Sequence, residues 1–327
     1  MNRKFDILVP MYKEEESVVK VLLDSISIQQ NVNFDEIGVI ICSDAGNSLS
    51  EQLISSYPFV IEMYNRKEHK GVSYTRNECL DKSKADYVMF CDADDLFYNA
   101  CGLWIIFNEI NGTGFDSLIS VFIEETRDAN KNPIYVNHQM DSTFVHGKIH
   151  RRKFLIDSNI RWNDNLVIHE DSYFNCLCQK LATELKYCPT PFYLWKWRDN
   201  SVCRHDKLYL NKTYVNMLES NTALVKQFMM RGKRKEAQFY ATSMIFDTYY
   251  SLNCDRWWTE EGNAYLQKTE LRFKEYWNEF KELFDEIEQI DKSQIIMGIK
   301  NRFFNEGLLL ERITFNDWIK HIENLED

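Results

Sequence analysis

Three aspartates stand close together where an apolar run of the chain ends. The run from Tyr87 to Cys91 is followed directly by Asp92, Ala93, Asp94 and Asp95. Asp92 and Asp94 are one residue apart, so in an extended chain they point to the same side and can hold one hard cation, such as Mg²⁺ or Mn²⁺. Taken alone, the same residues also fit a solvated acidic turn at the start of a helix. Their neighbours in the chain must decide between the two readings.

A second acidic pair, Glu170 and Asp171, follows the short apolar run 166–168. A carboxylate that meets a hydroxyl group in a buried site can remove its proton as a general base. Acidic residues are equally ordinary where a helix begins, because Asp is a favoured N-cap. On this pair alone, the cap is the better interpretation.

Strands and helices must bring these carboxylates together. Apolar runs with strand character alternate with helical patterns and short connections in residues 5–95. This alternation predicts an α/β fold with a mostly parallel sheet covered on both faces. Ligands of such sheets bind at the carboxyl ends of the strands. We therefore expect residues 10–14, Asp44 and Asp92/Asp94 to converge on one edge. The strands are expected at residues 5–9, 37–42, 60–64 and 87–91, and the helices at 18–26 and 71–82.

The chain changes character near residue 206. Before it we expect helices at 101–110, 151–157 and 171–181, and strands at 118–123, 134–136 and 192–197. After it only helical patterns occur, so we predict two domains, 1–205 and 206–327. The clearest helical stripe should pack on the main domain or a neighbouring helix, and this region can also serve a homo-oligomer interface. Its members are Phe273, Tyr276, Trp277, Phe280, Leu283, Phe284 and Ile287.

Composition excludes several classes of protein. The 327 residues contain no stretch approaching the roughly 20 apolar residues that cross a membrane, and no apolar leader follows Met1. The 9 Cys are dispersed without a Cys-x-x-Cys pair, which favours a reducing, cytoplasmic location. A net charge of -11 disfavours nucleic acid as a partner, although basic clusters at 151–153 and 231–235 keep a nucleic-acid acceptor open.

Several motifs, in the expected order over residues 5–205, resemble the family 2 glycosyltransferases of the GT-A fold. The segments that carry the resemblance are 7–15 (Ile-Leu-Val-Pro-Met-Tyr-Lys-Glu-Glu, like the opening strand and nucleotide loop), 43–48 (Ser-Asp-Ala-Gly-Asn-Ser, like Asp-Asp-Gly-Ser), 71–77 (Gly-Val-Ser-Tyr-Thr-Arg-Asn, like Gly-x-Ser-x-Ala-Arg-Asn), 92–95 (Asp-Ala-Asp-Asp, like the metal motif), 169–174 (His-Glu-Asp-Ser-Tyr-Phe, like the catalytic-base motif) and 197–204 (Trp-Arg-Asp-Asn-Ser-Val-Cys-Arg, like Arg-x-x-Ser). Each motif is weak alone, and their common order makes the resemblance strong.

The resemblance implies a metal-dependent, inverting transfer of a sugar from a nucleotide-sugar, most simply a UDP-sugar, to a hydroxyl of a glycan or glycolipid precursor. It implies Mn²⁺ or Mg²⁺ on Asp94 and Asp92, with His205 as a further candidate ligand. Asp171 becomes the general base, with Glu170 next in line. The residues implied to contact the donor are Pro10, Tyr12, Glu14, Asp44, Lys70, Arg76, Asp92, Ala93, Arg198, Ser201 and Arg204.

Two departures from the family pattern concern the nucleotide. Ser43 stands where the family commonly has its first Asp, and Ala45 replaces the usual glycine. Asp44 remains to accept a hydrogen bond from a uracil N–H. Three other functions stay open: a nucleotidyltransferase, a catalytically inactive nucleotide-sugar binding module, and a glycosyltransferase acting on modified DNA bases. The first needs a glycine-rich loop after the first strand, and residues 10–14 contain no glycine.

Overall fold

The computed structural model describes residues 3–199, 209–253, 260–287, 297–298, 300–301 and 313–325. The chain divides into two compact units, residues 1–198 and 199–327. The first unit combines strands and helices, whereas the described elements of the second are all helices. The predicted domain boundary near residue 206 lies outside the described residues.

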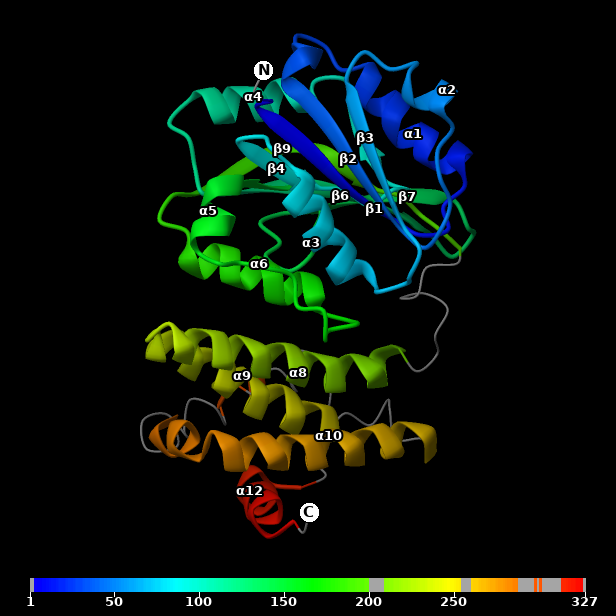
Figure 1. Ribbon diagram of the computed structural model, residues 1–327. Coiled ribbons are helices and arrows are strands. Elements are labelled where there is room, and N and C mark those ends of the chain that lie inside the picture. The colour runs from blue at the N-terminus through cyan, green and yellow to red at the C-terminus, as the bar shows by residue number, and fades with distance from the viewer. Residues whose placement is uncertain are drawn as a thin grey trace. The chain divides into compact units, whose positions relative to one another are not determined.

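The first unit is built on one nine-stranded sheet (Figure 1). Its strands are β1 (Phe5–Met11), β2 (Ile37–Asp44), β3 (Val60–Arg66), β4 (Tyr87–Phe90), β5 (Leu96–Phe97), β6 (Ser117–Arg127), β7 (Pro133–His138), β8 (Lys148–Arg151) and β9 (Leu185–Trp195). The order is β3-β2-β1-β4-β8-β6-β9-β5, and β7 pairs with β6. The strands β3, β2, β1 and β4 are parallel, whereas β5, β7 and β8 pair antiparallel to their neighbours. The expected α/β sheet is confirmed, with a parallel amino-terminal half and a mixed remainder.

Proline does not end the first strand. We expected the strand to stop at Val9, but β1 continues through Pro10 to Met11, with Pro10 opposite Cys42 of β2. Leu8 and Pro10 face the same neighbour because hydrogen-bonding directions alternate along a strand. On that side the backbone N–H of Cys91 donates to Leu8 at 2.9 Å, and β4 has already ended at Phe90. The missing N–H of Pro10 therefore costs no ladder bond.

Helices cover both faces of the sheet. They are α1 (Glu16–Ser27), α2 (Glu51–Ile54), α3 (Val72–Lys82), α4 (Gly102–Asn111), α5 (Arg152–Asp157) and α6 (Glu170–Leu181). Apolar side chains of α1 and α4 share one buried cluster with alternate residues of β1, among them Ile7 and Val9. On the other face α3 packs on β1 and β2, and Phe90 of β4 contacts Phe174 of α6 with ring centroids 5.5 Å apart (Figure 1). The expected two-sided covering is confirmed.

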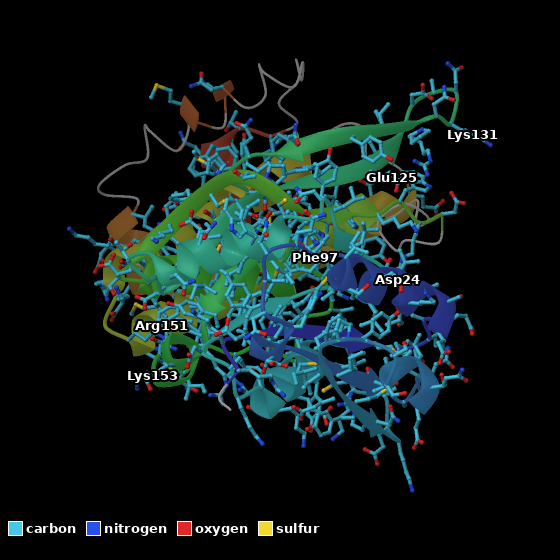
Figure 2. The ribbon with its side chains drawn as sticks, turned by 90° about the horizontal axis from the view of Figure 1, so that it is seen from above. Asp24, Phe97, Glu125, Lys131, Arg151 and Lys153 are labelled. Atoms are coloured by element: carbon cyan, nitrogen blue, oxygen red, sulfur yellow. The ribbon has the colours of Figure 1, made fainter. Side chains whose placement is uncertain are left out.

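Two strands, β5 and β8, were not expected, and β9 begins at Leu185 rather than at residue 192. The sequence of β8, Lys-Ile-His-Arg, has little strand character, and it becomes a strand because it lies between β4 and β6. The two-residue β5 is held by β9. The prolines 189 and 191 hid the first half of β9, and the irregular register opposite Ser120 and Phe122 accommodates them. The strands β6 and β7 form a hairpin, and the exposed turn of this hairpin carries Lys131 (Figure 2).

The second unit contains α8 (Tyr209–Met230), α9 (Arg234–Asn253), α10 (Glu260–Glu279) and α12 (Phe315–Asn324). The predicted aromatic stripe is buried at Phe273, Trp277 and Phe284, and Phe273 stacks on Trp318 of α12 at 5.3 Å. The stripe is not one helix, because α10 ends at Glu279 and helix resumes at residue 281. A neighbouring helix of the same unit therefore buries it. None of the described helices is both long enough and apolar enough to cross a membrane.

Substitution of Phe174 tests the packing of α6 behind the acidic pair Glu170 and Asp171. The buried ring of Phe174 stacks on Trp162 with centroids 4.2 Å apart. Phe174→Ala is expected to lower the free energy of unfolding by about 3–5 kcal/mol, because the truncation leaves a cavity. Urea denaturation measures the loss. Tyr98→Ala, at a position that is 47% exposed, serves as the control. Equal effects of the two substitutions would contradict this packing.

Candidate active site

The turn after β4 is a tight one that buries two of its carboxylates. The backbone N–H of Asp95 donates to the carbonyl of Asp92 at 3.1 Å, and Asp94, Asp95 and Ala93 are buried. The carboxylate of Asp95 accepts from the hydroxyl of Tyr193 at 2.6 Å and from the backbone N–H of residue 196 at 2.9 Å. Burial raises the pKa of Asp95 well above its usual range. Asp95 thus ties the end of β4 to β9.

Arg76 of α3 joins the two acidic segments that the sequence singled out. Its guanidinium donates through Nη2 to Asp92 at 3.0 Å and through Nη1 to Glu170 at 3.0 Å. The same group lies over the ring of Trp162, 4.4 Å from the centroid. Arg76 was expected to reach the nucleotide. In this structure it is buried, and its two terminal nitrogens are engaged with carboxylates.

The first turn of α6 presents Glu170 and Asp171 to this arginine. The N-cap is His169, in a left-handed conformation with φ 65°, and no side chain caps the helix. The carboxylate of Asp171 instead accepts from the backbone N–H of Ser172 at 2.7 Å. Burial raises the pKa of both Glu170 and Asp171, and the charge of Arg76 opposes that rise. The N-cap position thus belongs to His169, and Asp171 is a half-buried carboxylate with a raised pKa.

Asp92 and Asp94 differ in their electrostatic surroundings. Burial alone would raise the pKa of Asp92, but the neighbouring Arg76 holds it below its ordinary value. Burial, together with the charge of Asp92, raises the pKa of Asp94 to about 6. Arg198 forms an ion pair with Asp94 and lies 3.8 Å from Glu14. The side chain of Arg198 is 49% exposed, so it can leave Asp94 without opening the core.

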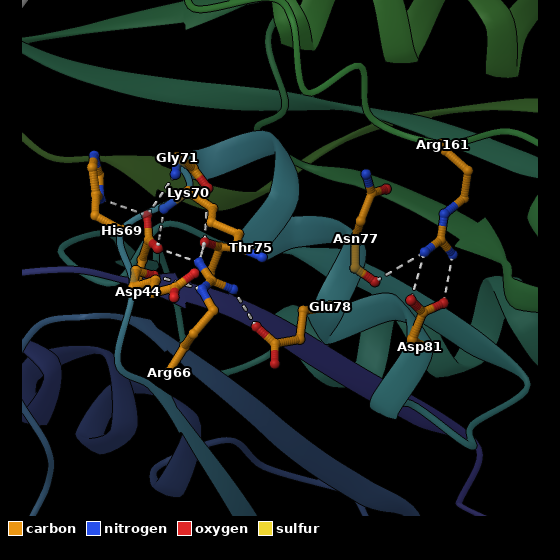
Figure 3. Close-up of polar contacts among 11 residues, drawn as sticks. Asp44, Arg66, His69, Lys70, Gly71, Thr75, Asn77, Glu78, Asp81 and Arg161 are labelled. Atoms are coloured by element: carbon orange, nitrogen blue, oxygen red, sulfur yellow. Dashed lines mark hydrogen bonds and ion pairs between the residues drawn. The ribbon is translucent and has the colours of Figure 1, made fainter.

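Asp44 ends β2 and is surrounded by donors (Figure 3). Its two oxygens accept from the backbone N–H groups of Lys70 and Gly71, each at 2.8 Å. Arg66 forms an ion pair with it, and Nδ1 of His69 lies 2.8 Å from its Oδ2. Burial alone would raise the pKa of Asp44, but these bonds hold it below its ordinary value. Asp44 therefore anchors the loop between β3 and α3.

The turn that follows Asp44 braces the expected nucleotide loop. Ala45 takes the left-handed conformation, with φ 58°, that the family's glycine would adopt easily. A Cβ at Gly46 would lie 1.1 Å from the carbonyl oxygen of Tyr12, so this position requires glycine. Asn47 donates from its backbone to Tyr12 at 3.0 Å. Ser43, at the departure from the family pattern, donates to the carbonyl of Asn47 at 2.8 Å.

One group of side chains near the turn after β4 is suited to a divalent cation. Asp92, Asp95 and His146 each offer a ligand atom, and these atoms lie within 4.8 Å of one another. His146 is buried, and its Nδ1 has no hydrogen-bond partner and lies 3.7 Å from Asp95. Burial lowers the pKa of His146 to about 3, which leaves a neutral imidazole. Neutral imidazole and carboxylate oxygens are both ligands that divalent metals accept.

The structure brings most of the expected site residues to one edge. Arg76 and Arg198 join one group of carboxylates, which consists of Glu14, Asp92, Asp94, Glu170 and Asp171. The other expected residues lie on the side of β1 and β2, and they are Pro10, Tyr12, Asp44 and Lys70. The expected contacts of Ser201, Arg204 and His205 lie outside the described residues.

Sequence reasoning missed Arg66, His69 and His146. The parallel pairing of β2 and β3 places Arg66 directly opposite Asp44. Aligning the ends of β2 and β3 in the sequence would have identified Arg66 as the partner of Asp44. His146 precedes β8, a strand that only tertiary pairing creates, so the spacing of residues gives no signal for it.

The model of the family described as "Glycosyl transferase family 2" matches residues 6–171. GgaB, a minor teichoic acid biosynthesis protein of Bacillus subtilis, is 29% identical over 195 residues, which cover 52% of this chain and 20% of GgaB. The cholesterol galactosyltransferase of Borreliella burgdorferi is 22% identical over 345 residues, covering 96% of this chain and 92% of that protein.

A solved structure shares the fold. The crystal structure of S. aureus TarS 1-349 in complex with UDP-GlcNAc superposes with a TM-score of 0.62 at 17% sequence identity, covering 83% of this chain and 80% of that chain. The similarity confirms the expected GT-A type of fold, with carboxyl-terminal helices after the sheet.

Asp44 and Asp81 form a matched pair for testing which carboxylate the fold requires, and both appear in Figure 3. Asp44→Ala is expected to lower the free energy of unfolding by about 1–3 kcal/mol, because it leaves the backbone N–H groups of Lys70 and Gly71 without their acceptor, while Arg66 keeps Glu78. Asp81, which is 60% exposed, pairs with Arg161 at the surface, and Asp81→Ala should cost only about 0–1 kcal/mol. Urea denaturation of both variants decides. A loss for Asp44→Ala no larger than for Asp81→Ala would show that Asp44 does not anchor the loop.

Proposed function

Because the chain belongs to glycosyl transferase family 2, we propose that it transfers a sugar from a nucleotide donor to an acceptor hydroxyl. The observation that carries this proposal is the position of Arg76. It joins Asp92, at the end of a central strand, to Glu170, beside Asp171 at the start of α6. A donor-side carboxylate and a candidate base thus share one buried site. A protein that only binds a nucleotide-sugar needs no general base, so the acidic pair Glu170 and Asp171 favours an enzyme over a binding module.

UDP is the nucleotide that this proposal assigns to the donor. TarS, whose fold is similar, has been crystallised with UDP-GlcNAc. In this chain the aromatic ring of Tyr12 and the carboxylate of Asp44 lie at neighbouring strand ends, where a planar base can stack and donate a hydrogen bond. Lys70 adds a cation at the same edge. Arg198, with Ser201 and Arg204, is assigned to the pyrophosphate, because arginine makes paired hydrogen bonds to phosphate.

A divalent ion, Mn²⁺ or Mg²⁺, fits the carboxylates after β4. The unpartnered Nδ1 of His146 and the hard oxygens beside it are the donor set such an ion takes. The resemblance to the family's metal motif assigns Asp92 and Asp94 as ligands, and Asp92 also belongs to the group that the structure forms with Asp95 and His146. His205 is proposed as a further ligand. When bound, the ion would neutralise the charge of the pyrophosphate.

Asp171 is proposed as the general base of an inverting transfer. It removes the proton from the acceptor hydroxyl while the sugar leaves the nucleotide, and Arg76 keeps Glu170 from occupying the same place. The raised pKa of Asp171 brings its basicity closer to that of a useful base at neutral pH. Ser172 fixes one of its oxygens through a backbone N–H at 2.7 Å.

The acceptor is proposed to be a hydroxyl of a glycan or glycolipid precursor. The names of two relatives support this class, since one is a teichoic acid biosynthesis protein and the other a cholesterol galactosyltransferase. One name refers to teichoic acid and the other to cholesterol, and neither refers to a protein or nucleic-acid acceptor. The helical region of residues 206–327 is proposed to govern access of the acceptor or self-association, without contributing a catalytic residue.

The two carboxylate groups can be separated by substitution. Asp94→Asn removes the charge that holds the cation, so binding of UDP with Mn²⁺ and sugar transfer should both fall. Asp171→Asn removes only the proton acceptor, so UDP affinity should stay near wild type while transfer falls by about 10²–10⁴. Isothermal titration with UDP and a transfer assay measure the two properties. Near wild-type transfer by Asp171→Asn would assign the base elsewhere, with Glu170 first in line.

The raised pKa of Asp94 predicts a pH dependence of donor binding. As the pH falls from 7.5 to 5, Asp94, with a pKa of about 6, takes up a proton and loses the charge that attracts a cation. The affinity for UDP in the presence of Mn²⁺ should therefore fall more steeply in the wild type than in Asp94→Asn. Protonation of the nucleotide itself affects both proteins alike. Parallel curves for the two proteins would exclude Asp94 from cation binding.

A further inference from the structure

The imidazole of His69 lies between two side chains assigned above to the nucleobase. Its ring stacks on Tyr12, with centroids 4.5 Å apart and planes inclined by 26°. Its Nδ1 lies 2.8 Å from Oδ2 of Asp44 (Figure 3). The imidazole ring of His69 therefore makes one aromatic contact with Tyr12 and one close polar contact with the carboxylate of Asp44.

These are the two contacts that a uracil ring would make at this edge. Uracil is a flat heterocycle that can stack on a tyrosine ring, and its ring N–H can donate to a carboxylate. Other groups of the described chain already contact Tyr12 and Asp44. Nζ of Lys13 lies 4.8 Å from the centroid of the Tyr12 ring, and Asp44 accepts from Arg66 and two backbone N–H groups in addition to its contact with His69.

We propose that His69 holds the place of the nucleobase in the free protein and must move out before the donor binds. This inference rests on the proposed function, because it takes Tyr12 and Asp44 as the nucleobase subsite. His69 then adds a fixed cost to the binding of every nucleotide. It is a determinant of donor affinity that neither the family pattern nor the spacing of residues indicates.

The position of His69 in the loop allows this movement. Its side chain is 56% exposed, and its neighbours Lys67 and Glu68 are exposed as well. Asp44 keeps its bonds to Arg66 and to the backbone of Lys70 and Gly71 when the imidazole turns away. Rotation of one side chain therefore opens the place without unfolding the loop.

Asp44 and His69 would then have separate effects on the choice of donor. Once His69 has left, Oδ2 of Asp44 keeps the backbone N–H of Gly71 and can accept one further hydrogen bond. Uracil supplies a ring N–H in its place. Cytosine offers an acceptor nitrogen at the same position and cannot. Asp44 therefore distinguishes uracil from cytosine, whereas His69 weakens both nucleotides equally.

The test is isothermal titration of UDP and CDP, each with Mn²⁺, into the wild type, His69→Ala and Lys67→Ala. His69→Ala is expected to bind both nucleotides about three- to tenfold more tightly, because no internal ring has to be displaced. The ratio of the UDP to the CDP affinity should stay unchanged. Lys67→Ala, two residues earlier in the same exposed loop, should match the wild type in both affinities.

Three results would overturn the inference. Weaker binding of UDP by His69→Ala would make His69 a wall of the nucleobase site that contacts the bound base. Equal affinity in His69→Ala and the wild type would mean that His69 does not occupy the place. If neither protein binds UDP, the proposed donor itself is wrong, and the inference fails with it. Thermal melting of the two loop variants checks that both remain folded.

Discussion

The buried guanidinium of Arg76 is the contact on which the arrangement of the candidate site depends. A buried arginine is tolerated only when carboxylates accept from it, and here Asp92 and Glu170 do so at 3.0 Å each. These bonds require that β4 ends at Phe90 and that α6 begins at Glu170. They also require α3 to pack on β1 and β2, which brings Arg76 to the strand ends. One side chain thus links three elements far apart in the sequence.

The charges around this arginine are unbalanced in the part of the chain that the structure describes. Arg76 and Arg198 serve Asp92, Asp94, Glu170 and Asp171. Burial is the main cause of the raised pKa values of Asp94, Glu170 and Asp171, and neighbouring carboxylates add to it. A donor that arrives with a divalent cation would balance the excess of carboxylates. The same excess of carboxylates therefore underlies both the proposed cation-dependent chemistry and the electrostatic cost of the site.

The sequence allowed the parts of the site that depend on local pattern to be predicted. Asp92 and Asp94 follow an apolar strand, and parallel strands bring their ends to one edge, so their convergence with Asp44 was expected. The contacts of His69 and His146 depend on loops folded by tertiary pairing, and no spacing rule indicates them. A nucleotide contact of Arg76 stays a prediction, whereas its bonds to two carboxylates were not predicted. Its position at a helix start suggested an anion ligand, but its side chain turns inward to Asp92 and Glu170. Pro10 likewise signals a strand end, although β4 stops early enough to make its missing N–H harmless.

We propose that the carboxylate cluster becomes a donor site only when a divalent cation balances its charge. The most direct measurement is the affinity of the wild-type protein for UDP in EDTA, in Mg²⁺ and in Mn²⁺, determined by isothermal titration at constant ionic strength. The account predicts that UDP binds at least about tenfold more tightly with either cation than in EDTA, a difference of roughly 1.4 kcal/mol or more. Equal affinity in EDTA and in the presence of the cations would contradict it.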